Sequence, residues 1–229
     1  MLAELLDGRA LTAGELAARA AVGASTASSH LSRLVEGGLL AVVRQGRHRY
    51  YRLAGPRVAH ALEALATLAP AAEARDPFER EILTGLRFAR TCYGHLAGRL
   101  GVALRDRLLE RELIRQDGLE HRVTPAGERW FTELGIDLDA ARGTRRSFAR
   151  ACLDWSERRP HLAGGLGDAM LAALVARGWV RRQPGERAVE LTEAGRAGLQ
   201  ASLGLSLPAA GLRAGAGRAA AREARSHVR

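Results

Sequence analysis

The sequence predicts a mainly α-helical protein with small β-hairpins, an α+β fold divided between two domains. Three observations support this class. Apolar residues recur with helical spacing, short alternating segments flank glycine-containing turns, and one segment of the second half is repeated with ten identities in twenty-one positions. With 229 residues, 47% of them hydrophobic, the chain is long enough for one large or two modest domains.

The first domain is predicted over residues 1–69, where short helices precede a hairpin. The opening sequence MLAELLDG gives a first short helical segment that ends at Gly8. Thr12 and Glu15 have the spacing of a capping box, which predicts a helix that begins there. A four-residue turn, AVGA, separates it from a second helix within the serine-rich segment ASTASSHLSRLVEGGLL, residues 24–40.

The rest of this domain is predicted to be a hairpin followed by a helix. The alternating sequence LLAVVRQGRHRYYRL predicts two strands joined about Gln45 and Gly46. After Pro56, the sequence RVAHALEALATLA predicts an amphipathic helix. Its buried stripe is expected to consist of Val58, Leu62 and Leu65. Residues 70–77 are predicted to be a linker.

The serine-rich helix has two different faces. Ala27, Leu31 and Leu34 follow the i, i+4, i+7 spacing of a buried stripe, whereas short polar side chains cover the remaining surface. A flat face of hydroxyl groups can enter the major groove of DNA and reach base edges and phosphates. The residues predicted to contact DNA from this helix are Ser25, Thr26, Ser28, Ser29, His30, Ser32 and Arg33.

A basic turn follows in the predicted hairpin. Arg44, Arg47, His48 and Arg49 cluster around it, as expected of a wing that contacts the phosphate backbone. Taken singly, the serines are typical of a solvated surface, and the arginines reflect composition, because all 35 basic residues are arginine. The order helix, turn, helix and basic hairpin is that of a winged helix-turn-helix domain, and the net charge of +10 also indicates a polyanionic partner.

Residues 1–69 resemble the ArsR/SmtB family of winged-helix transcriptional repressors. The resemblance implies a homodimer formed through the first and last helices of the domain. It also implies one recognition helix in each half-site of a palindromic operator in double-stranded DNA. The resemblance covers less than a third of the chain. It rests on the segment LTAGELAARAAVGASTASSHLSRLVEGGLLAVVRQGRHRYYRL. The residues that contribute most to it are Ser28, His30, Leu31, Leu34, Gly38, Leu39, Gly46, Tyr51 and Leu53.

The chain departs from the metal-sensing members of that family. They carry a Cys-x-Cys box at the helix before the recognition helix, where this chain reads ALTAGELA without a cysteine. For the family's other metal site, in the last helix, this chain offers only His60 and Glu63, a pair more typical of a solvated surface. We therefore expect any effector, an unknown small molecule or a metal, to act on the second domain.

The second domain is predicted over residues 78–203 and contains the repeat. HLAGRLGVALRDRLLERELIR, from His95, aligns without gaps with HLAGGLGDAMLAALVARGWVR, from His161. We expect two repeated helix-hairpin-helix, winged-helix-like units that sense an effector or support dimerisation. They could also contact DNA or another protein as additional winged helices. The basic, low-complexity tail, residues 204–229, is predicted to be disordered.

Two cysteine–histidine pairs stand at the start of the repeated segments. Cys92 precedes His95 by three residues, and Cys152 precedes His161 by nine. Thiolate and imidazole bind soft metals, so these four residues are a candidate metal or metalloid site. Buried packing of small apolar cysteines and a redox pair are the alternatives. A thiol enzyme or a protein-interaction module that uses Cys92 and His95 without operator DNA is the other function considered.

An organic or anionic ligand pocket is a further interpretation of the same region. Aromatic and basic residues are expected near helix starts, where backbone N–H groups favour anions. The candidate effector-binding residues are Cys92, Tyr93, His95, Cys152, Trp155, Arg158 and His161.

Composition excludes several other classes. Two cysteines are too few for a disulfide framework. No segment is long and apolar enough to span a membrane, and the N-terminus lacks the pattern of a signal peptide. We expect a cytoplasmic regulator without enzymatic activity and without a membrane partner, in which DNA binding requires no cofactor.

Overall fold

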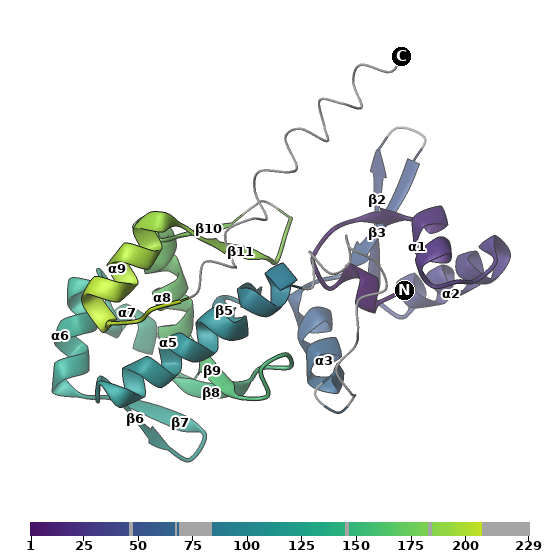
Figure 1. Cartoon of the computed structure of the whole chain (residues 1–229). Coiled ribbons are helices and arrows are strands. Elements are labelled where there is room, and N and C mark those ends of the chain that lie inside the picture. The colour runs from purple at the N-terminus through teal and green to yellow at the C-terminus, as the bar shows by residue number, and fades with distance from the viewer. Residues whose placement is uncertain (46–47, 67, 69–83, 145–146, 183–184, 208–229) are drawn as a thin grey trace. The chain divides into compact units, whose positions relative to one another are not determined.

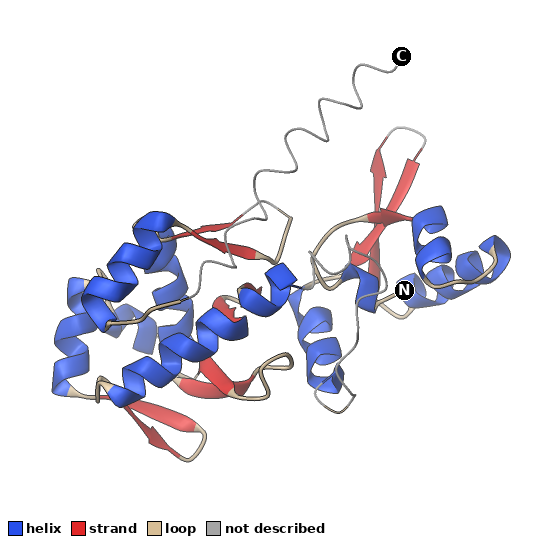
Figure 2. Ribbon diagram, viewed as in Figure 1, coloured by secondary structure: helices blue, strands red, loops and turns tan. Residues whose placement is uncertain are grey.

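The computed structural model describes residues 1–45, 48–66, 68, 84–144, 147–182 and 185–207 (Figure 1). The chain divides into two compact units. The N-terminal unit comprises Met1–Pro70 with Gln183–Arg187, and the C-terminal unit comprises Ala71–Arg182 with Ala188–Arg229. Both contain helices and strands (Figure 2). The predicted linker, residues 70–77, lies outside the described residues.

The N-terminal unit has two helices, a hairpin and a third helix in the predicted order. Its elements are the 3-10 helix η1 (Ala3–Leu5), β1 (Leu11–Thr12), α1 (Ala13–Arg19), α2 (Ala24–Glu36), β2 (Leu40–Gln45), β3 (His48–Leu53) and α3 (Pro56–Ala66). β1 pairs with β3, so that the sheet has three strands in the order β1-β3-β2. The sequence did not predict β1, because two residues are too few to show an alternating pattern.

The capping box at the start of α1 is confirmed. The backbone N–H of Thr12 donates to Glu15 Oε2 at 2.8 Å, and the backbone N–H of Glu15 donates to Thr12 Oγ1 at 3.3 Å. α1 and α2 then pack over one apolar core, whose buried members are Leu5, Leu11, Leu16, Leu31, Leu40, Leu53 and Ala59. Since α2 contributes Leu31 to this core, its polar face is directed to solvent.

The predicted stripe of α3 is confirmed at Val58 and Leu62, which are partly buried against the core, and is wrong at Leu65. Leu65 is 63% exposed, whereas Ala59 and Glu63 are buried. The Glu63 carboxylate accepts a hydrogen bond from Arg187 Nη2 at 2.6 Å, an interaction between residues 124 positions apart in the sequence. Apolar periodicity did not predict that Glu63 would be buried, because its ion pair is with a residue far along the chain.

The C-terminal unit has the order hairpin, helix, hairpin, helix twice. The first set is β4 (Arg90–Cys92), β5 (His95–Ala97), α5 (Gly98–Glu110), β6 (Ile114–Asp117), β7 (Glu120–Val123) and α6 (Pro125–Glu133). After α7 (Leu138–Arg142), the second set is β8 (Arg150–Leu153), β9 (Pro160–Ala163), α8 (Gly165–Ala176), β10 (Val180–Arg182), β11 (Val189–Leu191) and α9 (Glu193–Leu203). The hairpins β4–β5 and β8–β9 were not predicted, because the sequence HLAG was assigned to the helices that follow it.

Strands and helices of the two sets are interleaved. β5 contacts β9, α5 packs against β9, and α8 packs against β5. Glycines permit these approaches: a Cβ at Gly101 of α5 would lie 3.5 Å from Cβ of His161, and one at Gly167 of α8 would lie 3.1 Å from Cβ of His95. Gly101 and Gly167 occupy the same position in the two aligned segments. Each helix therefore lies directly against the histidine of the other hairpin.

Residues 204–207 follow α9, and Leu205 and Leu207 pack against the core of the unit, whereas the remainder of the predicted tail lies outside the described residues. Among the residues that the structure describes, no helix has both the length and the apolar composition needed to cross a lipid bilayer.

Candidate DNA interface and cysteine–histidine cluster

The predicted DNA-contacting side chains of the serine-rich helix all lie on the exposed surface of α2. The helix buries Ala27 and Leu31, and Leu34 is half-buried. The turn between α1 and α2 contains Ala21 with a positive φ of 52°. The exposed residues are Ser25, Thr26, Ser28, Ser29, His30, Ser32 and Arg33.

The hairpin β2–β3 carries the described basic residues of the predicted wing. Arg44 lies opposite Arg49 in the strand pairing, Gln45 lies opposite His48, and all four residues are exposed. Like charges directly opposite one another repel, so the Arg44–Arg49 pair favours an anion between or above the two guanidinium groups. Arg47 lies outside the described residues.

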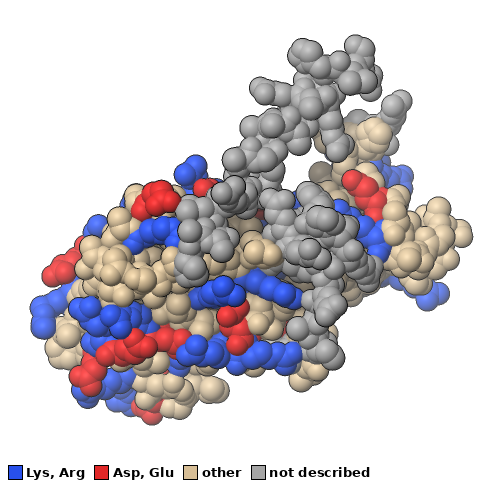
Figure 3. Space-filling model, viewed as in Figure 1, with Lys and Arg blue, Asp and Glu red and all other residues tan. Residues whose placement is uncertain are grey.

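Figure 3 shows how charge is distributed on one face of the molecule. The region that Figure 1 labels α2 is mostly uncharged on this face. On the C-terminal unit, arginines are interspersed with acidic residues. Salt bridges of the kind Arg122–Asp117 (2.6 Å) and Arg142–Glu128 (3.2 Å) account for part of this mixture. The visible face of the C-terminal unit is therefore not a continuous cationic surface.

The two cysteines and two histidines meet in the C-terminal unit. One ligand atom from each of Cys92, His95, Cys152 and His161 lies within 4.8 Å of those from the other three. We call these four residues the Cys–His cluster. In β4–β5, Cys92 lies opposite His95, and in β8–β9, Cys152 lies opposite His161. All four are buried, which leaves the Cys92 thiol inaccessible to a substrate of the considered thiol enzyme.

The two histidine rings of the cluster face one another. Their Nε2 atoms are 3.1 Å apart and the ring centroids 5.0 Å apart. The other ring nitrogen of each histidine faces a carboxylate: His161 Nδ1 lies 3.2 Å from Asp154 Oδ2, and His95 Nδ1 lies 3.5 Å from Asp168 Oδ1. A carboxylate close to one ring nitrogen favours the tautomer that carries its proton on that nitrogen.

Asp154 connects the cluster to the surrounding backbone. Its Oδ2 accepts a hydrogen bond from the backbone N–H of Gly98 at 2.7 Å and lies 3.0 Å from Arg90 Nη2. Its Oδ1 accepts from the backbone N–H groups of Ser156 and Glu157. Both Asp154 and Arg90 are almost completely buried. The N-terminus of α5 is thus occupied by a carboxylate of this chain.

The electrostatics of the cluster follow from these contacts. Burial opposes the charged form of Asp154, but His161, Arg90 and the Gly98 N–H outweigh it and hold the pKa of Asp154 well below its ordinary value. Burial likewise opposes protonation of His161, but Asp154 and the Cys92 thiol outweigh it and raise the pKa of His161. The contacts of Asp154 and Cys92 therefore favour the protonated form of His161.

The remaining candidate effector residues lie in hairpin turns, not at helix starts as expected. Tyr93 is in the turn of β4–β5 with a φ of 57°, and Arg158 is in the turn of β8–β9 with a φ of 56°. The Arg90 guanidinium lies 4.9 Å from the centroid of the Trp155 ring. Trp155 therefore packs over the buried Arg90, and the helix N-terminus that was expected to attract an anion is occupied by Asp154.

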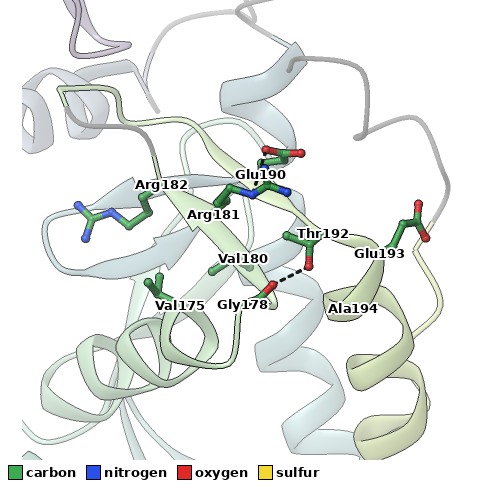
Figure 4. A pocket seen from close by; sticks show the side chains of 9 residues that line it. All are labelled: Val175, Gly178, Val180, Arg181, Arg182, Glu190, Thr192, Glu193 and Ala194. Carbon is green, nitrogen blue, oxygen red and sulfur yellow. Dashed lines mark hydrogen bonds and ion pairs between the residues drawn. The ribbon is translucent and has the colours of Figure 1, made fainter. Parts of the chain in front are cut away.

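A cavity of about 590 Å³ lies elsewhere in the C-terminal unit (Figure 4). Arg181 and Glu190 point toward one another at one side of it, with Nε and Oε2 3.8 Å apart, and Thr192 Oγ1 donates to the Gly178 carbonyl at 2.7 Å. None of its lining residues was a sequence candidate. They are Val175, Gly178, Val180, Arg181, Arg182, Glu190, Thr192, Glu193 and Ala194.

Three residues around the Cys–His cluster were not found from the sequence: Arg90, Asp154 and Asp168. Arg90 and Asp154 lie two residues from the cysteines, in the segments RTC and CLD. This proximity was a usable signal, because polar residues next to ligand-type side chains often orient them. Asp168 carried no such signal, since α8 brings it to His95 from 73 positions further along the chain.

Comparison with known proteins agrees with the description of the N-terminal unit. Residues 1–43 match the model of a helix-turn-helix domain. Over 207 residues the chain is 42% identical to an uncharacterised HTH-type transcriptional regulator of Bacillus subtilis, YdfF, an alignment that covers 90% of this chain and 92% of that protein. The similarity therefore extends through most of the C-terminal unit.

Proposed function

The chain belongs to the family of HTH-type transcriptional regulators that includes the Bacillus subtilis protein, and on this premise we propose that it is a homodimeric repressor of the ArsR type. It is a DNA-binding transcriptional regulator. In the proposal, α2 reads an operator in the major groove, the β2–β3 hairpin contacts the adjacent phosphates, and an effector at the C-terminal unit changes the affinity for DNA.

One observation carries the proposed mode of DNA binding. Seven predicted contact residues are exposed together on α2, while the same helix is anchored in the core by Ala27 and Leu31. A helix held in this way presents its polar face without rearrangement. Short side chains let the helix backbone approach base edges, and the paired Arg44 and Arg49 supply the positive charge that phosphates require.

The proposed homodimer forms through the first and last helices of the N-terminal unit. Leu65, in the last turn of α3, and Leu68, just after this helix, are 63% and 83% exposed. A second copy of the chain would cover these side chains and place two recognition helices on one operator. This arrangement is the one implied by the resemblance of residues 1–69 to ArsR/SmtB repressors.

The proposed regulatory role of the C-terminal unit rests on its two related halves. The duplication inferred from the sequence is supported by equivalent details: Thr124 and Thr192 both cap the following helix through the backbone N–H three residues later. Within the described segments, the candidate effector positions are the Cys–His cluster and the cavity beside β10 and β11. Residues 78–203 are the proposed extent of this regulatory domain.

Titration with duplex DNA from upstream of the protein's own gene tests the proposed interface. We expect sequence-selective binding that weakens about tenfold in the Ser28→Ala/Ser32→Ala variant, because two hydroxyl groups lose partners in the groove. The Arg44→Ala/Arg49→Ala variant should weaken binding to all sequences and reduce the slope of log affinity against log salt by about 2, one for each lost phosphate contact.

An exposed pair in the C-terminal unit is the matched control. Arg122→Ala/Asp117→Ala removes a solvent-exposed salt bridge and should leave operator affinity unchanged. Binding without sequence preference would refute operator recognition. Equal losses in the control and in the Arg44→Ala/Arg49→Ala variant would refute the assignment of the hairpin as a wing, and light scattering that finds a monomer at DNA-binding concentrations would refute the dimer.

A further inference from the structure

The Cys–His cluster brings four side chains of metal-ligand type together in the protein interior. Buried polar side chains are stable only when they have hydrogen-bond or metal partners. Cys92, His95, Cys152 and His161 are 3%, 3%, 7% and 1% exposed. The buried hydrophobic residues clustered with the two cysteines are Ala97 and Ala163, whose side chains are single methyl groups. One ligand atom of each of the four side chains lies within 4.8 Å of those of the other three.

The ring orientation indicates a cation between the two histidines. Each Nδ1 faces a carboxylate, so the proton of a neutral ring belongs on that nitrogen. Both Nε2 atoms then carry lone pairs, and these atoms are only 3.1 Å apart. Two facing acceptors repel in a buried place unless a positive ion or a shared proton lies between them.

The two thiols distinguish a metal ion from a shared proton. A proton would satisfy the histidines alone, and it would not account for Cys92 and Cys152 at the same centre. Two thiolates and two imidazoles are a ligand set of tetrahedral Zn²⁺, whereas Mg²⁺ and Ca²⁺ require oxygen ligands. Two thiolate charges would also neutralise Zn²⁺ within the cluster, which lowers the cost of burying the ion.

We propose that Cys92, His95, Cys152 and His161 bind one Zn²⁺ ion in a closed, four-coordinate site. Each hairpin supplies one cysteine and one histidine, from positions opposite one another in the strand pairing. Four protein ligands and complete burial are characteristic of a structural site without an open coordination position. The ion joins β4–β5 to β8–β9, and Asp154 and Asp168 orient the histidines from outside the ligand set. This site does not depend on the proposed repressor function.

Metal analysis of the full chain, purified under reducing conditions without chelator, tests the proposal. We expect about one zinc ion per chain in the wild-type protein and none in the Cys92→Ser/Cys152→Ser variant. His30→Gln/His48→Gln removes two exposed histidines and should retain the metal, which controls for zinc on surface histidines. Far-UV circular dichroism establishes whether each variant is folded.

Cobalt substitution gives a measurement that requires no variant. Co²⁺ bound to the wild-type protein should produce the intense visible bands of tetrahedral coordination and a thiolate-to-cobalt charge-transfer band.

The Asp168→Asn variant keeps all four ligands but loses the carboxylate that faces His95. Its zinc affinity, measured by competition with a chelating dye, should fall about 10- to 100-fold.

Three outcomes would overturn the proposal. The first is a folded, reduced wild-type protein that binds neither Zn²⁺ nor Co²⁺, which would make the cluster a packing feature or a proton-sharing histidine pair. The second is a disulfide between Cys92 and Cys152 in protein isolated without added reductant and with its thiols protected from air. The third is metal that survives Cys92→Ser/Cys152→Ser but is lost in His30→Gln/His48→Gln.

Discussion

The exposed face of α2 and the Cys–His cluster are built in opposite ways. The polar residues of α2 contribute little to the core, because Ala27 and Leu31 alone are buried from that helix. In the Cys–His cluster every side chain is buried and contacts groups from distant segments. Changes in the first region should therefore alter DNA binding with little effect on folding, whereas changes around the second should alter the stability of the C-terminal unit.

The largest expected effect is on the buried Arg90. The Arg90→Met variant leaves the Asp154 carboxylate buried without its guanidinium partner, and it should lower the free energy of unfolding of the C-terminal unit by about 3–5 kcal/mol. All three tryptophans lie in this unit, so urea denaturation followed by tryptophan fluorescence reports its stability selectively. Arg99→Met, at an exposed position of α5, is the control and should change stability by less than about 0.5 kcal/mol. Equal losses of stability in Arg90→Met and Arg99→Met would contradict the stabilising role of the buried Arg90–Asp154 pair.

Acid should destabilise the C-terminal unit through His121. Burial and then the Arg105 guanidinium lower the pKa of His121 to about 4, and its Nε2 accepts a hydrogen bond from Arg105 Nε. The folded state thus binds this proton more weakly than the unfolded state. The contribution of His121 is complete above the unfolded-state pKa of 6.5 and is lost as the pH falls toward 4, by about 3 kcal/mol.

The His121→Gln variant isolates this effect. It removes the titrating ring but keeps a side chain that can accept the Arg105 hydrogen bond. Tryptophan-monitored unfolding between pH 7 and pH 4, with a chelator present throughout, should show a shallower loss of stability in the variant. Parallel pH profiles would show that other groups govern the acid response.

A smaller effect is expected at the start of α1. The Thr12→Ala variant loses one side of the capping box and should destabilise the N-terminal unit by about 1 kcal/mol. Thr26→Ala is the matched control, because Thr26 lies in the first turn of α2, which has no side-chain cap. Amide hydrogen exchange in α1 and α2 measures both variants, and equal protection would contradict a stabilising role of the cap.

The smallest change in stability is expected from substitutions on the exposed polar face of α2. The Ser28→Ala/Ser32→Ala variant is expected to bind operator about tenfold more weakly. It should change the free energy of unfolding of the N-terminal unit by less than about 0.5 kcal/mol per site. Circular dichroism provides that measurement. A large loss of stability would mean that these serines support the fold, which would weaken the distinction between the two regions.

Local patterns predicted the N-terminal unit better than the C-terminal one. The capping box, the α2 face and the β2–β3 hairpin depend on residues a few positions apart. The buried face of α3 depends on Arg187, and the equivalence of Cys92 and Cys152 depends on hairpin pairing. A gap-free alignment does not align Cys92 with Cys152, because the two hairpin turns differ in length. The turn between β8 and β9 has six residues, whereas the turn between β4 and β5 has two.

The pairing of one cysteine with one histidine in each hairpin bears on how the proposed metal site is assembled. Neither half of the C-terminal unit holds more than two of the four ligands. Two half-length chains arranged about a twofold axis would together supply all four side chains, so the proposed metal site requires both halves. The two halves differ in their carboxylates: one histidine faces Asp154, which lies in a turn, and the other faces Asp168, which lies in a helix.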